Sequence, residues 1–123
     1  MFNVSRAGII TVNRGDSFDI PIVLNVGDSM DFRQYAILPH DTVYLGVMEP
    51  NQPFECALIR KRYTYEDLDE RGNLIVHFSS RDTECLLPGK YYYQVKLQTV
   101  RNQQKNEYDV ETVVDKTLFY IQE

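Results

Sequence analysis

The sequence lacks several features that mark large classes of protein. It has no tryptophan and only two cysteines in 123 residues. No window approaches the ~18 consecutive apolar residues that a membrane-spanning helix requires. The first residues, Met1–Arg6, show no basic segment followed by an apolar stretch, which a secretory signal would contain. These absences predict a protein that is made in a cytoplasm and has no membrane partner.

Positive charge is scarce as well. The chain has 13 Lys and Arg residues against 18 Asp and Glu residues, which gives a formal net charge of −5. Proteins that bind nucleic acid displace counterions with clustered Lys and Arg. The one basic run, Arg60–Arg62, is soon offset by Glu66, Asp67, Asp69 and Glu70, and we interpret it as a solvated strand end before an acidic turn. The charge pattern therefore predicts no nucleic-acid partner.

The two cysteines, Cys56 and Cys85, are expected to be reduced thiols because the sequence shows no export signal. A disulfide between them is the alternative. A metal site that combines them with His40 and His77 is disfavoured, because no two of these residues have the spacing of two to four residues that preorganises zinc ligands. We therefore expect neither a metal ion nor another cofactor.

The residues that are present are typical of one globular β domain. Hydrophobic residues make up 43% and charged residues 25%, and the nine Tyr and six Phe residues favour strands. A chain of this length can bury one core, so residues 1–123 are predicted to form a single domain. No segment of about ten or more residues shows the 3.6-residue apolar stripe of a helix.

Apolar residues recur at every second position in most segments, as they do in strands with one buried face. Turn residues such as Gly, Pro, Asn and Asp separate these segments. About seven to eight short strands arranged in this way predict an all-β fold, an antiparallel Ig-like β-sandwich. The expected strands are Gly8–Val12, Ser17–Val26, Thr42–Met48, Phe54–Arg60, Leu74–Phe78, Tyr91–Val100, and a return strand that begins at Tyr108 and continues as Lys116–Ile121 after a bend or bulge at Asp115.

Some segments allow finer predictions. Pro21 cannot donate to a strand ladder, so Ser17–Val26 should lie at the edge of a sheet. Thr42–Met48 is largely apolar on both faces, which is typical of a central strand. The expected connections are a turn at Gly27–Asp31, a loop with one irregular strand at Phe32–Asp41, and a helical turn or long loop at Thr64–Asn73.

The segment Asp82–Leu97 is the most informative in the chain. A Pro-Gly turn opens directly into a Tyr-rich alternating strand, a pattern typical of a corner in a β-sandwich. Tyr91 and Tyr93 are predicted to face the core, whereas Tyr92 faces solvent.

No constellation of residues specifies a reaction. Glu66 and Asp69 lie in an acidic loop where nothing buries either group, whereas catalytic carboxylate pairs need a cleft. The same loop lacks the Gly and Glu of a calcium-binding EF-hand. His77 has no partner in a nucleophile motif and is interpreted as structural. The tripeptide Arg14–Asp16, a sequence that some adhesion receptors bind, is interpreted as a turn. We expect no catalytic residue and no enzyme, and a small hydrolase is the least favoured hypothesis.

Surface tyrosines are the candidate partner-binding residues. Tyr92, Tyr44 and Tyr120 lie in predicted strands, and tyrosine is enriched at protein interfaces. Packing in the core or at its rim is another interpretation of these residues. Aromatic rings also stack on sugars, so a carbohydrate-binding or host-surface adhesion module is the alternative function.

The order of the elements resembles that of a known family. A Gly-Asp turn opens a long alternating strand at Arg14–Phe18, and an aromatic central strand follows. Gly72–Val76 joins a Gly-Asn turn to an apolar strand, and Asp82–Tyr93 carries the Pro-Gly corner and its tyrosines. Over about Ile9–Ile121 this order is similar to that of the N-terminal domain of bacteriophage baseplate upper proteins and of related small Ig-like virion proteins.

The resemblance implies a non-enzymatic structural component of a tailed-phage or prophage virion, synthesised in the host cytoplasm. Such a module would dock on other virion structural proteins and form homo-oligomers in the particle. In the family the sandwich is followed by helical and host-binding regions, whereas this sequence ends at Glu123. A stand-alone assembly, neck, tail or head-decoration protein is therefore expected as readily as a baseplate adaptor. Two predicted edge strands, Ser17–Val26 and Lys116–Ile121, could pair with a neighbour's sheet.

Overall fold

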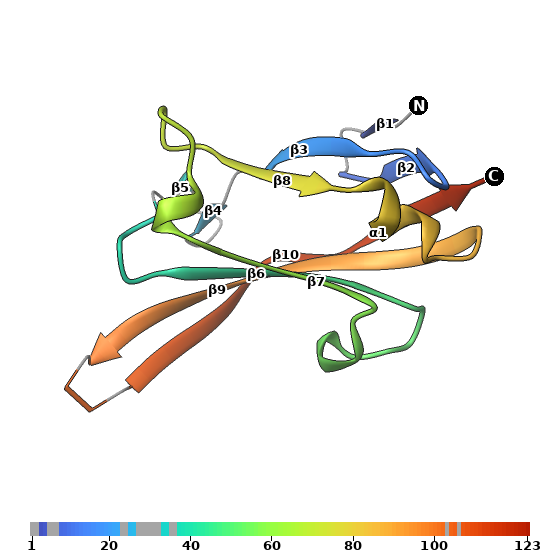
Figure 1. The fold of residues 1–123 in the computed structure, drawn as a ribbon. Helices are drawn as coiled ribbons and strands as arrows, with labels where there is room; N and C mark the ends of the chain where they lie inside the picture. Colours follow the sequence, from blue (N-terminus) through green and yellow to red (C-terminus); the bar gives the residue numbers. More distant parts are fainter. Residues whose placement is uncertain are drawn as a thin grey trace.

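The computed structural model describes residues 3–4, 8–22, 25–26, 33–34, 37–102, 104–105 and 107–123, and it is mostly β (Figure 1). The strands are β1 (Asn3–Val4), β2 (Ile10–Asn13), β3 (Phe18–Ile22), β4 (Asn25–Val26), β5 (Arg33–Gln34), β6 (Thr42–Met48), β7 (Ile59–Thr64), β8 (Leu74–Phe78), β9 (Gly89–Asn102) and β10 (Glu107–Gln122). Three short helices join them, the 3-10 helices η1 (Phe54–Cys56) and η2 (Tyr65–Asp67) and the α-helix α1 (Ser80–Glu84).

Six strands form one curled sheet in the order β1-β2-β10-β9-β6-β7. β6 lies between β9 and β7, which confirms the prediction of a central strand at Thr42–Met48. The prediction that all strands are antiparallel was wrong, because β10 pairs with β2 in parallel and the sheet is mixed. Parallel strands need a long connection, and here the whole chain between Ile10 and Phe119 provides it.

A second, two-stranded sheet, β3–β8, lies over one face of the large sheet (Figure 1). Aromatic rings fill the space between the two. Phe18 of β3 stacks on Phe78 of β8 with ring centroids 4.8 Å apart, and Phe119 of β10 lies 5.6 Å from Phe78. Tyr93 of β9 meets Phe119 edge-on at 6.4 Å. The alternation predicted for Leu74–Phe78 is confirmed, since Leu74, Val76 and Phe78 are buried and Ile75 and His77 are exposed.

β3 is an edge strand, as its proline predicts. Within the described residues it pairs only with β8, and Pro21 stands opposite Ile75. The strand ends at Ile22, and the predicted continuation through Leu24 lies outside the described residues, as does the predicted turn at Gly27–Asp31. β4 pairs with β5, which falls in the segment where one irregular strand was expected.

The prediction of a strand at Phe54–Arg60 was wrong. η1 occupies its first residues, Cys56 and Leu58 are exposed, and the strand β7 starts only at Ile59. Phe54 is apolar for a reason other than a place in a strand. Its ring covers Gly46 of β6 so closely that a Cβ atom at Gly46 would lie 2.9 Å from the ring. Arg60–Arg62 consequently lies inside an edge strand rather than at a solvated strand end.

The corner before β9 contains a short helix that the sequence analysis did not predict. Ser79 and Asp82 form a capping box at the start of α1, a signal that the sequence does carry. After the helix, the Tyr91 hydroxyl donates a hydrogen bond to the Leu87 carbonyl at 2.8 Å. Tyr91 and Tyr93 are buried and Tyr92 is half-buried, so the predicted alternation of this strand is confirmed.

β9 and β10 form a long hairpin that extends past the rest of the sheet (Figure 1). Thr42, the first residue of β6, pairs with Gln98, so residues 99–102 of β9 pair only with residues 107–109 of β10 among the described strands, and Val110 follows opposite Gln98. We call residues 99–102 and 107–110 the arm. The bulge predicted at Asp115 is confirmed by a register shift between Val114 and Thr117.

The edge prediction for Lys116–Ile121 was wrong over the second half of the segment. Phe119–Ile121 pair with β9 on one side and with β2 on the other, so they lie in the interior of the sheet. In the described part of the chain, the edge of β10 without a partner strand instead runs along residues 107–118, which begin in the arm.

Candidate interaction surface

The large sheet has one face that β3–β8 does not cover, which we call the outer face. Residues on successive positions of a strand alternate between faces, and the core residues Val43, Val47, Val95 and Phe119 fix which face is buried. The register then assigns the outer face. It includes Tyr44, Gly46 and Met48 of β6, Arg60 and Arg62 of β7, Tyr92, Lys96, Gln98 and Val100 of β9, and Tyr108, Val110, Leu118 and Tyr120 of β10.

All three tyrosines predicted to bind a partner lie on the outer face, each half-buried. Tyr92 stands opposite Met48 on one side and Leu118 on the other. Tyr120 is the diagonal neighbour of Tyr92 on the adjacent strand, a position whose Cα atom lies about 7–8 Å away. Tyr44 lies four positions from Met48 along β6, about 13 Å away. The structure therefore brings Tyr92 and Tyr120 together and leaves Tyr44 in a separate part of the same face.

The arm carries two exposed apolar side chains that the sequence analysis did not single out. Tyr108 is 51% exposed and Val110 is 59% exposed. They stand opposite Val100 and Gln98 of β9, which places them on the outer face. In the sequence they alternate with acidic residues, as apolar residues do in a half-buried strand. Their exposure in the structure shows that no second layer of described residues covers them.

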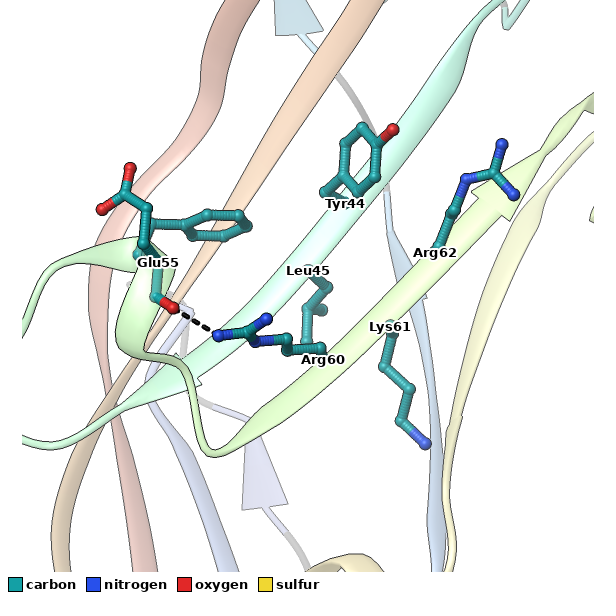
Figure 2. Close-up of a pocket in the computed structure, with 7 residues that line it drawn as sticks. Tyr44, Leu45, Glu55, Arg60, Lys61 and Arg62 are labelled. Atoms are coloured by element: carbon teal, nitrogen blue, oxygen red, sulfur yellow. Dashed lines mark hydrogen bonds between the residues drawn. The ribbon is translucent and has the colours of Figure 1, made fainter.

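A pocket of about 430 Å³ opens on the outer face beside the edge strand (Figure 2). The rings of Tyr44 and Phe54 and the side chains of Arg60 and Arg62 line it. Arg60 is held in place because its guanidinium donates hydrogen bonds to the Ala57 carbonyl at 3.3 Å and to the Glu55 carbonyl. The pocket is thus basic and aromatic on a chain whose net charge is negative.

Two further cations border this pocket differently. The Lys96 ammonium lies 4.9 Å from the centroid of the Phe54 ring, a cation–π contact that keeps positive charge beside the pocket. Lys61 points to the other side of the sheet (Figure 2).

Arg62 makes no hydrogen bond or ion pair with any residue in the described part of the chain. Arg62 can therefore bind an external acceptor without giving up an internal one.

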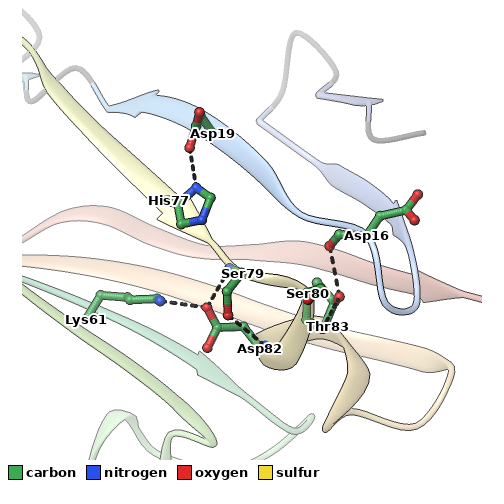
Figure 3. Close-up of polar contacts among 8 residues, drawn as sticks. All are labelled: Asp16, Asp19, Lys61, His77, Ser79, Ser80, Asp82 and Thr83. Atoms are coloured by element: carbon green, nitrogen blue, oxygen red, sulfur yellow. Dashed lines mark hydrogen bonds and ion pairs between the residues drawn. The ribbon is translucent and has the colours of Figure 1, made fainter.

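On the core side, Lys61 forms an ion pair with Asp82 at 2.6 Å (Figure 3). The Lys61 ammonium also lies 5.5 Å from the centroid of the Phe78 ring. Partial burial opposes ionisation of Asp82, but the hydrogen bonds from Lys61 and Ser79 outweigh it, and the pKa of the Asp82 carboxyl falls below its usual value. This pair joins the large sheet to α1 and has a structural role.

Replacing Asp82 with asparagine should lower the free energy of unfolding at neutral pH by about 1–2 kcal/mol, because a charge-assisted hydrogen bond and an ion pair are lost. The folded pKa lies below the unfolded value of 3.8, so the contribution is complete above that pH and is lost as the pH falls through the folded pKa. Urea denaturation at neutral pH and at about pH 2 should show a wild-type advantage only at neutral pH. Asp109→Asn, an exposed carboxylate on the arm, is the control. An equal difference at both pH values would contradict the assignment.

His77 and the Arg14–Asp16 tripeptide, which the sequence analysis interpreted as structural, contact neighbouring elements of the fold. His77 contacts Asp19 across β3–β8 at 2.6 Å, and both side chains are 62% exposed (Figure 3). The Arg14–Asp16 tripeptide forms the predicted turn, and the Gly15 amide donates to the Thr83 hydroxyl at 2.9 Å. The receptor-type tripeptide is thereby tied to α1.

The thiols and the carboxylates of the described residues form no candidate metal site. Cys56 and Cys85 are free and exposed. In residues 3–123, apart from the undescribed gaps, no group of three His, Cys, Asp or Glu residues could hold a metal ion. No helix in the described part of the chain has the length and apolar character needed to cross a membrane.

No protein-family model, curated protein or solved structure matches this chain. What the protein does must therefore be inferred from its own residues and geometry.

Proposed function

We propose that this chain is a non-enzymatic structural component of a tailed-phage or prophage particle, in its baseplate, tail, neck or head fibres, and that it acts through contacts with other virion proteins. The observation that carries the proposal is the arm, which places exposed apolar side chains beyond the body of the fold. The assignment to a phage particle is supported by the resemblance in the order of the elements.

The arm has the properties of an anchor. Tyr108 and Val110, with Val100 beside them, form an apolar strip on one face. Tyrosine at such a position contributes large contact area with little loss of conformational freedom, and aromatic anchors dominate protein interfaces. The free edge of β10 beside this strip carries Glu107, Asp109 and a β-bulge, features that prevent pairing of one edge strand with another. A partner therefore binds the face of the arm rather than its edge.

We also propose that the two sheets form an Ig-like β-sandwich. The rings of Phe18, Phe78 and Phe119 pack between the sheets as the core of a sandwich would. Tyr91 supports the same proposal, because its hydroxyl bonds back to the carbonyl of Leu87 at the start of a strand. That contact has the form of the tyrosine corner found in Ig-like domains.

The proposal is tested on particles produced from the phage or prophage that carries the gene. Mass spectrometry of purified particles should detect the chain, and the double variant Tyr108→Ser/Val110→Ser should enter particles at least tenfold less, because it removes the apolar strip. The control is Asp109→Asn/Glu111→Gln, which alters the opposite face of β10 and should be incorporated normally. Circular dichroism should show both variants folded, since all four side chains are exposed. Absence of the wild type from particles would refute the proposal.

A carbohydrate-binding module is the second candidate. The observation that favours it is the series of rings along β6 on the outer face, where Tyr44, Phe54 and Tyr92 follow one another. Sugars stack on such surfaces. A glycan array signal that Tyr92→Ala abolishes would favour this function, whereas absence of signal would leave assembly as the function.

A further inference from the structure

The basic pocket has a complement elsewhere in the same chain. η2 and the turn that follows it, residues 65–72, form a loop rich in carboxylates at the far end of β7. We call residues 65–72 the acidic loop. Along the extended strand, about 13 Å separates Arg60 from Thr64, where the loop begins. No hydrogen bond or ion pair between described residues joins the acidic loop to the residues that line the pocket.

The carboxylates of the acidic loop divide into two groups. Asp67 accepts from the Thr64 amide at 2.8 Å, and Asp69 accepts from the amides of Arg71 and Asn73. These bonds hold the loop in shape. Glu66 and Glu70 have no hydrogen bond or ion pair with the described residues, and both are exposed. The loop is therefore a preorganised support that presents two available carboxylates.

The pocket offers a matching pair of cations. Arg60 and Arg62 are two positions apart on β7 and share the outer face, so their Cα atoms lie about 6–7 Å from each other. Guanidinium groups bind carboxylates with two parallel hydrogen bonds, which makes arginine well suited to this contact. In Figure 2 the Glu55 carboxylate points away from the two guanidinium groups, so it does not occupy the position of an incoming acid.

An aromatic side chain accompanies the two carboxylates. Tyr65 at the start of the acidic loop is 48% exposed. The pocket is walled by Tyr44 and Phe54, and a volume of about 430 Å³ holds a tyrosine ring. Aromatic rings contribute most when they pack against other rings or under a guanidinium group.

We propose that the basic pocket of one copy binds the acidic loop of a second copy, with Glu66 and Glu70 facing Arg60 and Arg62. The two surfaces differ, so two arrangements satisfy the contact. In a two-fold dimer each pocket receives the partner's loop, and in a head-to-tail arrangement repetition builds a ring if the rotation closes and an open row of subunits if it does not. The inference rests on the proposed function, because it names a second copy of this chain as one partner of a protein that acts in assembly. A contact between one pocket and one loop is small and therefore weak in solution. It is strengthened in a particle, where the local concentration of subunits is high.

A charge-swap experiment tests the contact on the purified chain. By sedimentation velocity at about 0.05 M salt the wild type should self-associate, and added salt should weaken the association because exposed ion pairs are screened. Arg60→Glu/Arg62→Glu and Glu66→Lys/Glu70→Lys should each weaken it at least tenfold. An equimolar mixture of the two variants should associate again, because each retains one intact surface and the reversed surfaces are complementary.

The control variant is Glu84→Lys/Glu123→Lys, which makes the same change in net charge as Glu66→Lys/Glu70→Lys at exposed positions outside both surfaces and should associate like the wild type. A wild type that stays monomeric at about 1 mM would overturn the inference. So would a mixture that remains monomeric while each folded variant is also monomeric. Binding of phosphate or free glutamate to a monomeric wild type, seen by NMR, would instead identify a small-anion site. None of these results bears on the arm, because the arm is tested by incorporation into particles.

Discussion

Phe119→Ala should lower the free energy of unfolding by about 3–5 kcal/mol, the largest effect of any single substitution considered for this chain. The Phe119 side chain is 0% exposed and lies in the only strand of the large sheet that pairs with both β2 and β9. Its ring contacts Phe78 on β8 and Tyr93 on β9. The substitution removes these contacts and leaves a cavity between the two sheets, which the bulky neighbours cannot fill without moving.

Urea denaturation followed by circular dichroism measures this effect. Small domains are stable by about 5–15 kcal/mol, so the alanine variant should be strongly destabilised, and Phe119→Leu provides a milder variant that should lose about 1–2 kcal/mol. Val110→Ala on the exposed arm should change stability by less than about 0.5 kcal/mol. A Phe119→Ala variant as stable as Val110→Ala would show that the two sheets do not share a core.

Thr83→Val should cost about 2–3 kcal/mol, although valine has nearly the same shape. Thr83 is 0% exposed. Its hydroxyl accepts from the Gly15 amide at 2.9 Å and lies 2.9 Å from the Asp16 carbonyl and 3.2 Å from the Ser80 carbonyl, to which it can donate. The side chain thus ties the turn between β2 and β3 to α1 (Figure 3). Valine cannot make these hydrogen bonds. A buried polar group that loses its partner destabilises the fold by the full cost of its desolvation.

The serine variant separates the hydrogen bonds from the packing. Thr83→Ser keeps the hydroxyl and removes one methyl group, so it should cost about 1 kcal/mol. Denaturation curves should therefore rank the variants as wild type, serine, valine in order of decreasing stability. The reverse order for serine and valine would show that Thr83 acts through packing alone.

The local pattern of the sequence was enough to predict much of the fold. Alternation placed Tyr91 and Tyr93 in the core and Tyr92 outside it, because strand geometry alone sets that relation. Pro21 indicated an edge because the missing amide is a property of the residue itself. These predictions needed no knowledge of which strands are neighbours.

The predictions that were wrong depended on which elements are neighbours in the folded sheet. Phe54, Cys56 and Leu58 alternate like a strand, yet the Phe54 ring folds onto Gly46, a contact that the local sequence does not reveal. Lys116–Ile121 was predicted to be an edge because nothing in the sequence indicates that β2, at the other end of the chain, pairs with it.

The same distinction holds for the candidate surface. Tyr44, Tyr92 and Tyr120 could be chosen as surface residues from their strands, but their common face follows from the register of three strands. The basic pocket was missed because its walls come from β6, β7 and η1 and meet only in the folded sheet. Arg60 and Arg62 did carry a signal, since two arginines at alternate positions share one face of a strand.

The parallel pairing of β2 with β10 also governs the order in which the molecule can form. The paired residues Ile10 and Phe119 are about 110 positions apart, and contacts of such long range are slow to form because the loop between them must first close. While the chain is emerging from a ribosome, the only described strand available to β2 is the two-residue β1. The parallel pairing of β2 can therefore form only once Phe119–Gln122 become available, and the large sheet cannot be completed before then.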